Sequence, residues 1–351
     1  ALSGLVLYTY LAARFWPVFL AVFVVWAAVA EPRRMRRRAA GVAVAVAAAA
    51  LVFAPLGLHF ARHPADFWER AGQVLANRQL EGSSLWAAYG RNAWETAAGF
   101  LGRGDPRWHY NLPGRPIVPG VWGLLFVAGL ATCLVRIRQV RYALVPLWLA
   151  VLAVPGVLTL ELQPAGQRMF GILPAMALAC GLGLAALADG TARAAAWLRA
   201  RAGRAGAGPG PPSEGARWRA LAAVVAAGLL PPGDLGLAGA VPAYRDWTSR
   251  PETAHIFNAD YAAIQAMARR DVEAGRAVVV LSEHYRHPTV AFGAPELVER
   301  LVWAEPRHAV PVPARGTGEV VYYAPLSYLP EDAPALRWLA ANATETTRWS
   351  V

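Results

Sequence analysis

Long uncharged apolar runs separate short polar blocks from the start of the chain to residue 241. A helix that crosses a bilayer core needs about 20 apolar residues, because its backbone has to satisfy its own hydrogen bonds where no water is present. Six stretches meet or approach this length, and the last of them contains Pro231 and Pro232. The six expected spans are residues 15–30, 39–58, 117–135, 142–160, 169–188 and 220–241.

After residue 241 the pattern changes to that of a water-soluble domain. Two segments have the apolar spacing of helices, and two are short apolar runs typical of buried strands. The expected elements are a helix at 258–274, strands at 277–282 (AVVVLS) and 319–326 (EVVYYAPL), and a helix at 333–343. The pattern therefore predicts a polytopic α-helical membrane region, residues 1–241, followed by a small C-terminal α/β domain, residues 242–351.

The basic residues gather in blocks between the apolar runs. All 34 are arginine and the formal charge is +11, a balance that by itself also suits nucleic-acid binding. Blocks between spans instead follow the positive-inside rule, under which short arginine-rich loops stay in the cytoplasm. Three blocks alternate with the other loops, so we expect them on one face. They are Arg33, Arg34, Arg36, Arg37 and Arg38; Arg136, Arg138 and Arg141; and Arg193, Arg199, Arg201, Arg204, Arg217 and Arg219.

This orientation places the loop 59–116, the short loop 161–168 and the domain 242–351 on the extracytoplasmic side. We therefore expect a multi-pass protein of the inner cell membrane with membrane lipids, and no nucleic acid, as partners. Cys133 and Cys180 both occur inside apolar runs. They are expected to be small buried hydrophobic residues and not a disulfide.

Three polar clusters fall on the expected extracytoplasmic face, each at a membrane boundary. Arginine at such a boundary can hold a phosphate through a bidentate fork, and tyrosine or tryptophan can stack on a sugar or lie among lipid headgroups. A sugar linked to a lipid through phosphate presents both groups. The candidate substrate-binding residues are Tyr8, Tyr10 and Arg14 in the first cluster, Asp105 and Trp108 in the second, and Glu161 and Arg168 in the third.

Each of these residues also has a plainer interpretation. Arg14 and Arg168 can snorkel to lipid headgroups. Tyr8 and Tyr10 are of the residue type that forms aromatic belts at membrane surfaces. Asp105 in a Gly-Asp-Pro sequence is typical of an Asx turn.

No metal or cofactor is expected. His59 and His63 have the i, i+4 spacing of a helical zinc site, but the chain offers no better third ligand than Asp66. Ser282 lacks the glycine-flanked turn of a hydrolase nucleophile. His284 and His287 follow a predicted strand and are expected on a loop surface.

Three segments also carry a family resemblance. They are LYTYLAARFWP at 7–17, FLGRGDPRWHYNLPGRP at 100–116, and the Glu-x-x-Pro-x-x-x-Arg-x-x-Gly-x-x-Pro pattern of Glu161, Pro164, Arg168, Gly171 and Pro174. Over roughly residues 1–190 the chain resembles the bacterial relatives of dolichyl-phosphate-mannose protein mannosyltransferases, which are membrane glycosyltransferases of the GT-C type. The resemblance implies transfer of a sugar from a polyprenyl-phosphate carrier to a glycan, lipid or protein acceptor on the extracytoplasmic side.

The resemblance further implies a catalytic carboxylate in the first extracytoplasmic loop, acting as general base on the acceptor hydroxyl. The chain has no counterpart, so this residue is expected upstream of Ala1 and the fragment alone is expected to be inactive. Arg14 and Arg168 would stabilise the phosphate leaving group. Two other classes of function stay open. One is a non-catalytic membrane scaffold or sensor, and the other is a transporter, which would place ionisable residues in mid-membrane.

Overall fold

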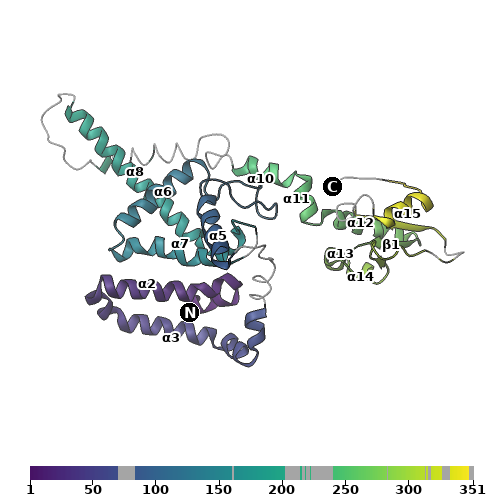
Figure 1. The fold of residues 1–351 in the computed structure, drawn as a ribbon, viewed down its shortest axis with the longest axis horizontal. Helices are drawn as coiled ribbons and strands as arrows, with labels where there is room; N and C mark the ends of the chain where they lie inside the picture. Colours follow the sequence, from purple (N-terminus) through teal and green to yellow (C-terminus); the bar gives the residue numbers. More distant parts are fainter. Residues whose placement is uncertain are drawn as a thin grey trace. The chain divides into compact units, whose positions relative to one another are not determined.

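The computed structural model divides the chain into two compact units, Ala1–Tyr244 and Arg245–Val351 (Figure 1). It describes residues 1–69, 84–159, 162–201, 240–282, 284–312, 318–325 and 333–347, together with residues 214, 215, 218, 222 and 314. The sixth expected span, 220–241, therefore lies almost entirely outside the described residues. The first unit is helical, and the second contains a small sheet.

Among the described residues of the first unit, four helices are long and apolar enough to cross a membrane. One begins in the 3-10 helix η2 and continues as α2, and another begins in η3 and continues as α8. The segments are η2 (Leu11–Phe15) with α2 (Trp16–Ala30), α3 (Pro32–Arg62), α7 (Val140–Leu158), and η3 (Gly166–Ile172) with α8 (Leu173–Arg201). A shorter apolar helix of 16 residues, α6 (Gly120–Val135), lies within the expected span 117–135. The unit thus has the helices of a membrane protein.

The first arginine block is helical, whereas the sequence pattern indicated a loop. Helix α3 already begins at Pro32, so only Glu31 separates it from α2. Proline is favoured at the first position of a helix, and arginine has a high helix propensity. The arginines of this block therefore occupy the first turns of α3, and the connection between the two helices is a single residue.

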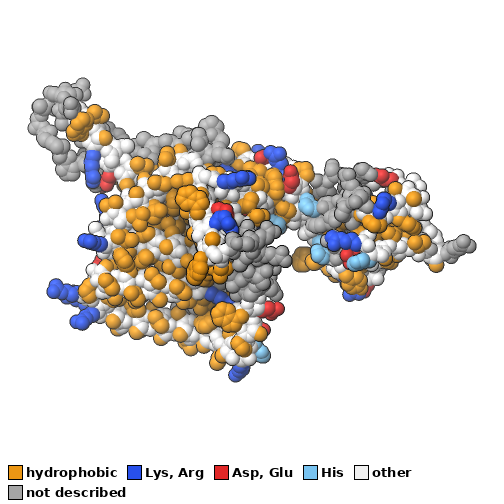
Figure 2. Space-filling view, in the orientation of Figure 1, with side chains coloured by type: hydrophobic (Ala, Val, Ile, Leu, Met, Phe, Trp, Pro, Cys, Tyr) orange, Lys and Arg blue, Asp and Glu red, His pale blue; other side chains and the backbone are white. Residues whose placement is uncertain are grey.

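The first two arginine blocks lie at the same end of the first unit. The Trp26 indole donates to the Ile137 carbonyl at 3.2 Å, and the Glu31 carboxylate accepts from the Val140 N–H at 3.4 Å. These bonds join the α2–α3 connection to the α6–α7 connection. Figure 2 shows arginine side chains along this end of the helical unit, beyond the apolar sides of the helices.

Helices α6 and α8 cross through small residues. A Cβ atom added to Gly129 would lie 1.7 Å from the Ala179 carbonyl oxygen, and one added to Gly183 would lie 1.8 Å from the Leu125 carbonyl oxygen. Such contacts suit helices in lipid, where close packing has to replace the hydrophobic effect between them. Cys133 is fully buried in the same core, as expected, whereas Cys180 is only half-buried.

The shorter helices of the first unit pack against its long helices. Helix α1 (Leu2–Leu5) and η1 (Val6–Tyr8) pack beside α3, where Gly4 approaches the Ala49 carbonyl too closely for a side chain. Helix α5 (Leu85–Gly99) packs against α7. The end of the unit away from the arginine blocks includes the described parts of two connections, residues 63–69, 84–116 and 162–166.

The second unit has a three-stranded parallel sheet in the order β2-β1-β3. Its elements are α11 (Pro251–Ile256), α12 (Ala259–Glu273), β1 (Ala277–Leu281), α13 (Pro288–Gly293), α14 (Pro295–Val298), β2 (Val302–Ala304), β3 (Val320–Tyr323) and α15 (Pro334–Asn342), and α10 (Ala240–Thr248) contains the boundary with the first unit. Two expected helices, α12 and α15, and two expected strands, β1 and β3, are confirmed. Strand β2 was not predicted, because three residues give no periodic pattern.

The crossing of α6 and α8 generates a prediction. Gly183→Ala places a methyl group against a carbonyl oxygen, so we expect the helices to separate and the unfolding free energy in detergent to fall by about 1–3 kcal/mol. Gly181→Ala is the matched control, since nothing lies within 4 Å of its added Cβ. Thermal unfolding of both variants checks this; equal melting temperatures would contradict the crossing.

Candidate functional site

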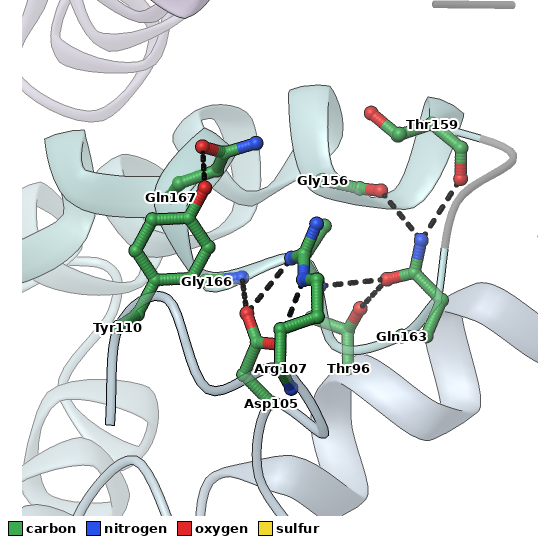
Figure 3. Close-up of polar contacts among 10 residues, drawn as sticks. Thr96, Asp105, Arg107, Tyr110, Gly156, Thr159, Gln163, Gly166 and Gln167 are labelled. Carbon is green, nitrogen blue, oxygen red and sulfur yellow. Dashed lines mark hydrogen bonds and ion pairs between the residues drawn. The ribbon is translucent and has the colours of Figure 1, made fainter. Parts of the chain in front are cut away.

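Two of the three predicted polar clusters meet at one end of the first unit (Figure 3). The Asp105 carboxylate accepts hydrogen bonds from the backbone and guanidinium N–H groups of Arg107 at 2.8 to 3.0 Å. It also accepts the Gly166 backbone N–H at 3.0 Å. The Tyr110 hydroxyl donates to the side-chain oxygen of Gln167. We call these five residues the loop junction, since they join the loop 100–116 to the loop 162–168.

The backbone around Asp105 is fixed by a closed turn. The Gly104 N–H donates to the Gly114 carbonyl at 3.1 Å, and the Gly114 N–H donates to the Asp105 carbonyl at 2.9 Å. A Cβ atom on Gly104 would lie 1.9 Å from the Arg115 carbonyl oxygen. Gly114 has φ of 76°, in the left-handed region that glycine adopts without strain. The glycines at both ends of the turn thus let Asp105 face the second loop.

Asp105 is 8% exposed, and its two oxygens accept four hydrogen bonds in all. An ionised carboxylate offers about four lone-pair positions. The bond from the Arg107 N–H is the Asx turn that the Gly-Asp-Pro sequence indicated. Asp105 therefore fastens two loops together and directs no free lone pair toward a substrate.

Helix α5 holds the second loop from another side through buried polar groups that the sequence analysis missed. The Asn92 amide donates to the carbonyls of Val157 at 3.0 Å and Thr159 at 2.9 Å. The Gln163 amide donates to the Thr159 carbonyl at 2.8 Å, and the Thr96 hydroxyl donates to the Gln163 oxygen at 3.4 Å. The only sequence signal was the spacing of two polar residues four positions apart, which places them on one face of a helix.

The other predicted residues of these clusters have different environments. Arg168 lies in η3 and is buried, with 6% of its surface exposed. Trp108 is half-buried in the loop 100–116. Glu161 lies outside the described residues. The structure thus brings Arg168 into the loop that Asp105 and Gln163 hold in place.

The first predicted cluster lies beside the second and third, but its arginine points to other partners. η2 packs against η3. The Arg14 guanidinium lies over the Phe67 ring at 4.0 Å and the Phe60 ring at 5.2 Å, and it donates to the Phe67 carbonyl. The structure therefore places Arg14 at the C-terminal end of α3, where two aromatic rings orient its guanidinium.

An open pocket of about 300 Å³ lies around this arginine. The Tyr8 hydroxyl donates to the Val52 carbonyl at 2.9 Å and accepts from the Leu56 N–H at 3.3 Å. In a regular helix, the Val52 carbonyl and the Leu56 N–H would form a hydrogen bond with each other. The Tyr10 side chain has no hydrogen bond to any residue that the structure describes, and it is 47% exposed. The pocket is lined by Leu7, Tyr8, Thr9, Tyr10, Leu11, Arg14, Leu56 and Phe60.

In the second unit, one expectation about the histidines was wrong. His284 is exposed, but His287 is 4% exposed because its ring stacks on Tyr261, with centroids 3.6 Å apart and planes 5° apart. The Tyr261 hydroxyl donates to the Ser282 hydroxyl at 2.8 Å, and Ser282 donates to the His284 carbonyl at 2.9 Å. Ser282 is therefore a buried turn residue, in line with its poor match to a nucleophile.

No metal centre forms in the described ranges of the chain. His59 and Asp66 do approach each other, with Nε2 and Oδ2 2.9 Å apart, and the His63 ring lies 4.9 Å from the His59 ring. Both partners of the His59–Asp66 pair are half exposed. The pair lies at the C-terminal end of α3, next to the aromatic rings that contact Arg14.

Comparisons of the chain with family models, with curated proteins and with solved structures found no match. The resemblance to membrane glycosyltransferases is thus carried by its three sequence segments alone. The loop junction and the Arg14 pocket are the two arrangements from which a function has to be argued.

The loop junction generates the next prediction. Asp105→Ala leaves the Gly166 N–H and the Arg107 guanidinium without their acceptor, so we expect the unfolding free energy to fall by about 1–3 kcal/mol. Asp246→Ala removes a half-exposed Asp–Arg pair and serves as control, with an expected loss of less than about 1 kcal/mol. Thermal unfolding in detergent measures both; a smaller loss for Asp105→Ala than for Asp246→Ala would show that the carboxylate does not join the loops.

The buried histidine generates a pH prediction. The His287 Nδ1 accepts the Thr289 N–H at 3.3 Å, and burial, followed by the charge of His284, lowers the pKa of His287 below 6.5. The unfolded chain then binds the proton more readily, so stability is full above pH 6.5 and falls as the pH drops from there toward the lower folded pKa. Hydrogen exchange of residues 277–293 measures this loss. His287→Gln should flatten the pH dependence, whereas His308→Gln, at an exposed position, should keep it.

Proposed function

We propose that this chain is part of a membrane glycosyltransferase that moves a sugar from a polyprenyl-phosphate carrier to an acceptor on the extracytoplasmic face. The observation that carries the proposal is the pocket around Arg14. It combines a cation, two tyrosines and an apolar wall at the end of two helices that are long enough to cross a membrane. A lipid that carries a sugar on a phosphate has the complementary groups. Its phosphate suits the cation, its sugar ring suits a tyrosine, and its hydrocarbon chain suits the apolar wall.

Arg14 is suited to the phosphate. A guanidinium has five N–H donors, and within the described residues Arg14 uses one of them, at the Phe67 carbonyl. Stacking on Phe60 and Phe67 fixes the plane of the group. A fixed guanidinium loses less side-chain entropy when it binds a phosphate in a bidentate manner.

The lipid and the sugar have separate surfaces in this pocket. Leu56 and Phe60 belong to α3, which continues as an apolar helix away from the pocket. They suit the first isoprene units of a carrier. Tyr10 is half exposed at the pocket and suits contact with the sugar ring. The loop junction keeps the neighbouring loop and its buried Arg168 beside η2, where a second cation would stabilise the leaving phosphate.

The direction of the protein in the membrane follows from the arginine blocks. The Arg14 pocket lies at the start of the η2–α2 span, and the first two blocks lie at its other end. If short arginine-rich connections stay in the cytoplasm, the pocket opens on the extracytoplasmic side. On this proposal the C-terminal α/β domain lies on the same side and positions the acceptor.

We assign no general base within the described part of the chain. Asp105, the buried carboxylate of the loop junction, accepts four hydrogen bonds and has its lone pairs occupied. The residues of this chain would hold the donor and stabilise its phosphate, and the proton of the acceptor hydroxyl would go to a carboxylate elsewhere in the protein.

A binding measurement tests the proposal. The chain in detergent is titrated with farnesyl phosphate, a short polyprenyl phosphate. Arg14→Gln should weaken binding by about tenfold to a hundredfold, since a hydrogen bond to a charged group contributes roughly 1.5–3 kcal/mol. Arg136→Gln is the matched control, because Arg136 also stacks on an aromatic ring but at the opposite end of the unit.

Two results would contradict the proposal. Equal affinity of the wild type and Arg14→Gln would show that the arginine does not hold the phosphate. Equal affinity for farnesyl alcohol and farnesyl phosphate would show that the phosphate is not recognised at all. Either outcome, with Arg136→Gln unchanged, favours a scaffold or sensor role.

A further inference from the structure

Helix α5 has its polar and apolar sides reversed relative to a helix on a water-soluble protein. The residues that it buries against the rest of the unit include Asn92, which is completely buried, and Thr96, which is 3% exposed. Its most exposed large side chains are Trp86 at 82% and Trp94 at 74%. A surface helix in water normally buries its apolar residues and exposes its polar ones.

The helical repeat places these two sets on opposite faces. With 3.6 residues per turn, positions 88, 92, 96 and 99 share one face, and positions 86, 90, 94 and 97 share the other. The second face consists of Trp86, Gly90, Trp94 and Ala97, so it carries no polar side chain. All four of these residues are exposed. We call them the outer face of α5.

The position of α5 relative to the long apolar helices indicates the surroundings of its outer face. Its inner face is bonded to the carbonyls at the end of α7, through Asn92, and to Gln163, through Thr96. The helix is thus held at the level where the α7 span ends. Figure 1 shows α5 running across the direction of α2, α3 and α7. Its axis therefore lies along the plane of a membrane that those helices cross.

We propose that α5 is an interfacial helix whose outer face lies in the headgroup region of the bilayer, with Trp86 and Trp94 as its anchors. Tryptophan is the residue type enriched at this depth, because its ring is apolar and its N–H is polar. Arg91 is exposed at the side of the helix, between the two faces, so its guanidinium can reach water and headgroup phosphates. The inference does not rest on the proposed transferase activity.

One consequence concerns the candidate site. The inner face of α5 holds the loop that contains Gln163 and, further along, Gly166. An α5 fixed at the headgroup level fixes this loop at the same level. The loop junction is then held at the depth of the lipid phosphates, and this placement does not depend on which ligand the protein binds.

Spin labels can locate the outer face. The full chain, with Cys133→Ala and Cys180→Ala, carries a single label at Gly90→Cys or Ala97→Cys in vesicles of phosphatidylethanolamine and phosphatidylglycerol. Both sites are exposed, and nothing lies within 4 Å of a Cβ added to Gly90. We expect both labels to collide more readily with oxygen, which dissolves in the bilayer, than with a water-soluble nickel chelate. A label at Tyr285→Cys, in the second unit, should show the reverse.

Two outcomes would overturn the inference. Ready collision of both α5 labels with the nickel chelate would place the outer face in water. Protection from both reagents would place it against protein. If the cysteine changes disturb the fold, quenching of tryptophan fluorescence by brominated lipids replaces the labels. Quenching that is equally strong in the wild type and in the Trp86→Phe, Trp94→Phe variant would then also overturn it.

Discussion

The Asp105 carboxylate is the interaction on which the arrangement of the first unit depends. It accepts from the Arg107 guanidinium and also from the Gly166 backbone N–H, which lies 61 positions further along the sequence. Asp105 and Arg107 belong to the loop 100–116, which leads into α6, and Gly166 begins η3, which leads into α8. The carboxylate therefore helps to fix where both helices begin. Helices α6 and α8 cross at Gly129 and Gly183, where the space between them does not admit even one methyl group. A small displacement of the loops at Asp105 would thus also displace the two helices where they cross.

A second constraint is the reversal of polarity that a bilayer imposes. Helix α3 is 31 residues long and has no buried residue, yet its middle is almost entirely Ala, Val and Leu. Helix α5 buries an asparagine and a threonine and exposes two tryptophans. Both facts are costly for a protein in water and favourable for one in lipid, because the outside is then apolar and the polar groups find partners within the protein. The exposed apolar surface is a requirement of the environment.

Much of this fold could be predicted from the chain itself, because apolar length and periodicity are local properties. The helices α2, α7, α8, α12 and α15 and the strands β1 and β3 follow from them. Membrane topology predicted only that Asp105 and the loop 161–168 share one face, and the bond from Gly166 to Asp105 could not be foreseen from it. The burial of His287 and the role of Asn92 were missed, because they depend on Tyr261 and Val157, partners from distant elements. The side-chain direction of Arg14 was equally out of reach, since Phe60 and Phe67 decide it.

The function that we propose for this chain is binding of a sugar carried on a polyprenyl phosphate. The most direct measurement is sugar release from radiolabelled polyprenyl-phosphate sugars by the protein in lipid vesicles, produced with any segment that precedes Ala1 in its gene. We expect release that requires an acceptor and that is lost when an acidic residue of an extracytoplasmic loop is replaced by its amide. No release from any such carrier by the folded protein would contradict it.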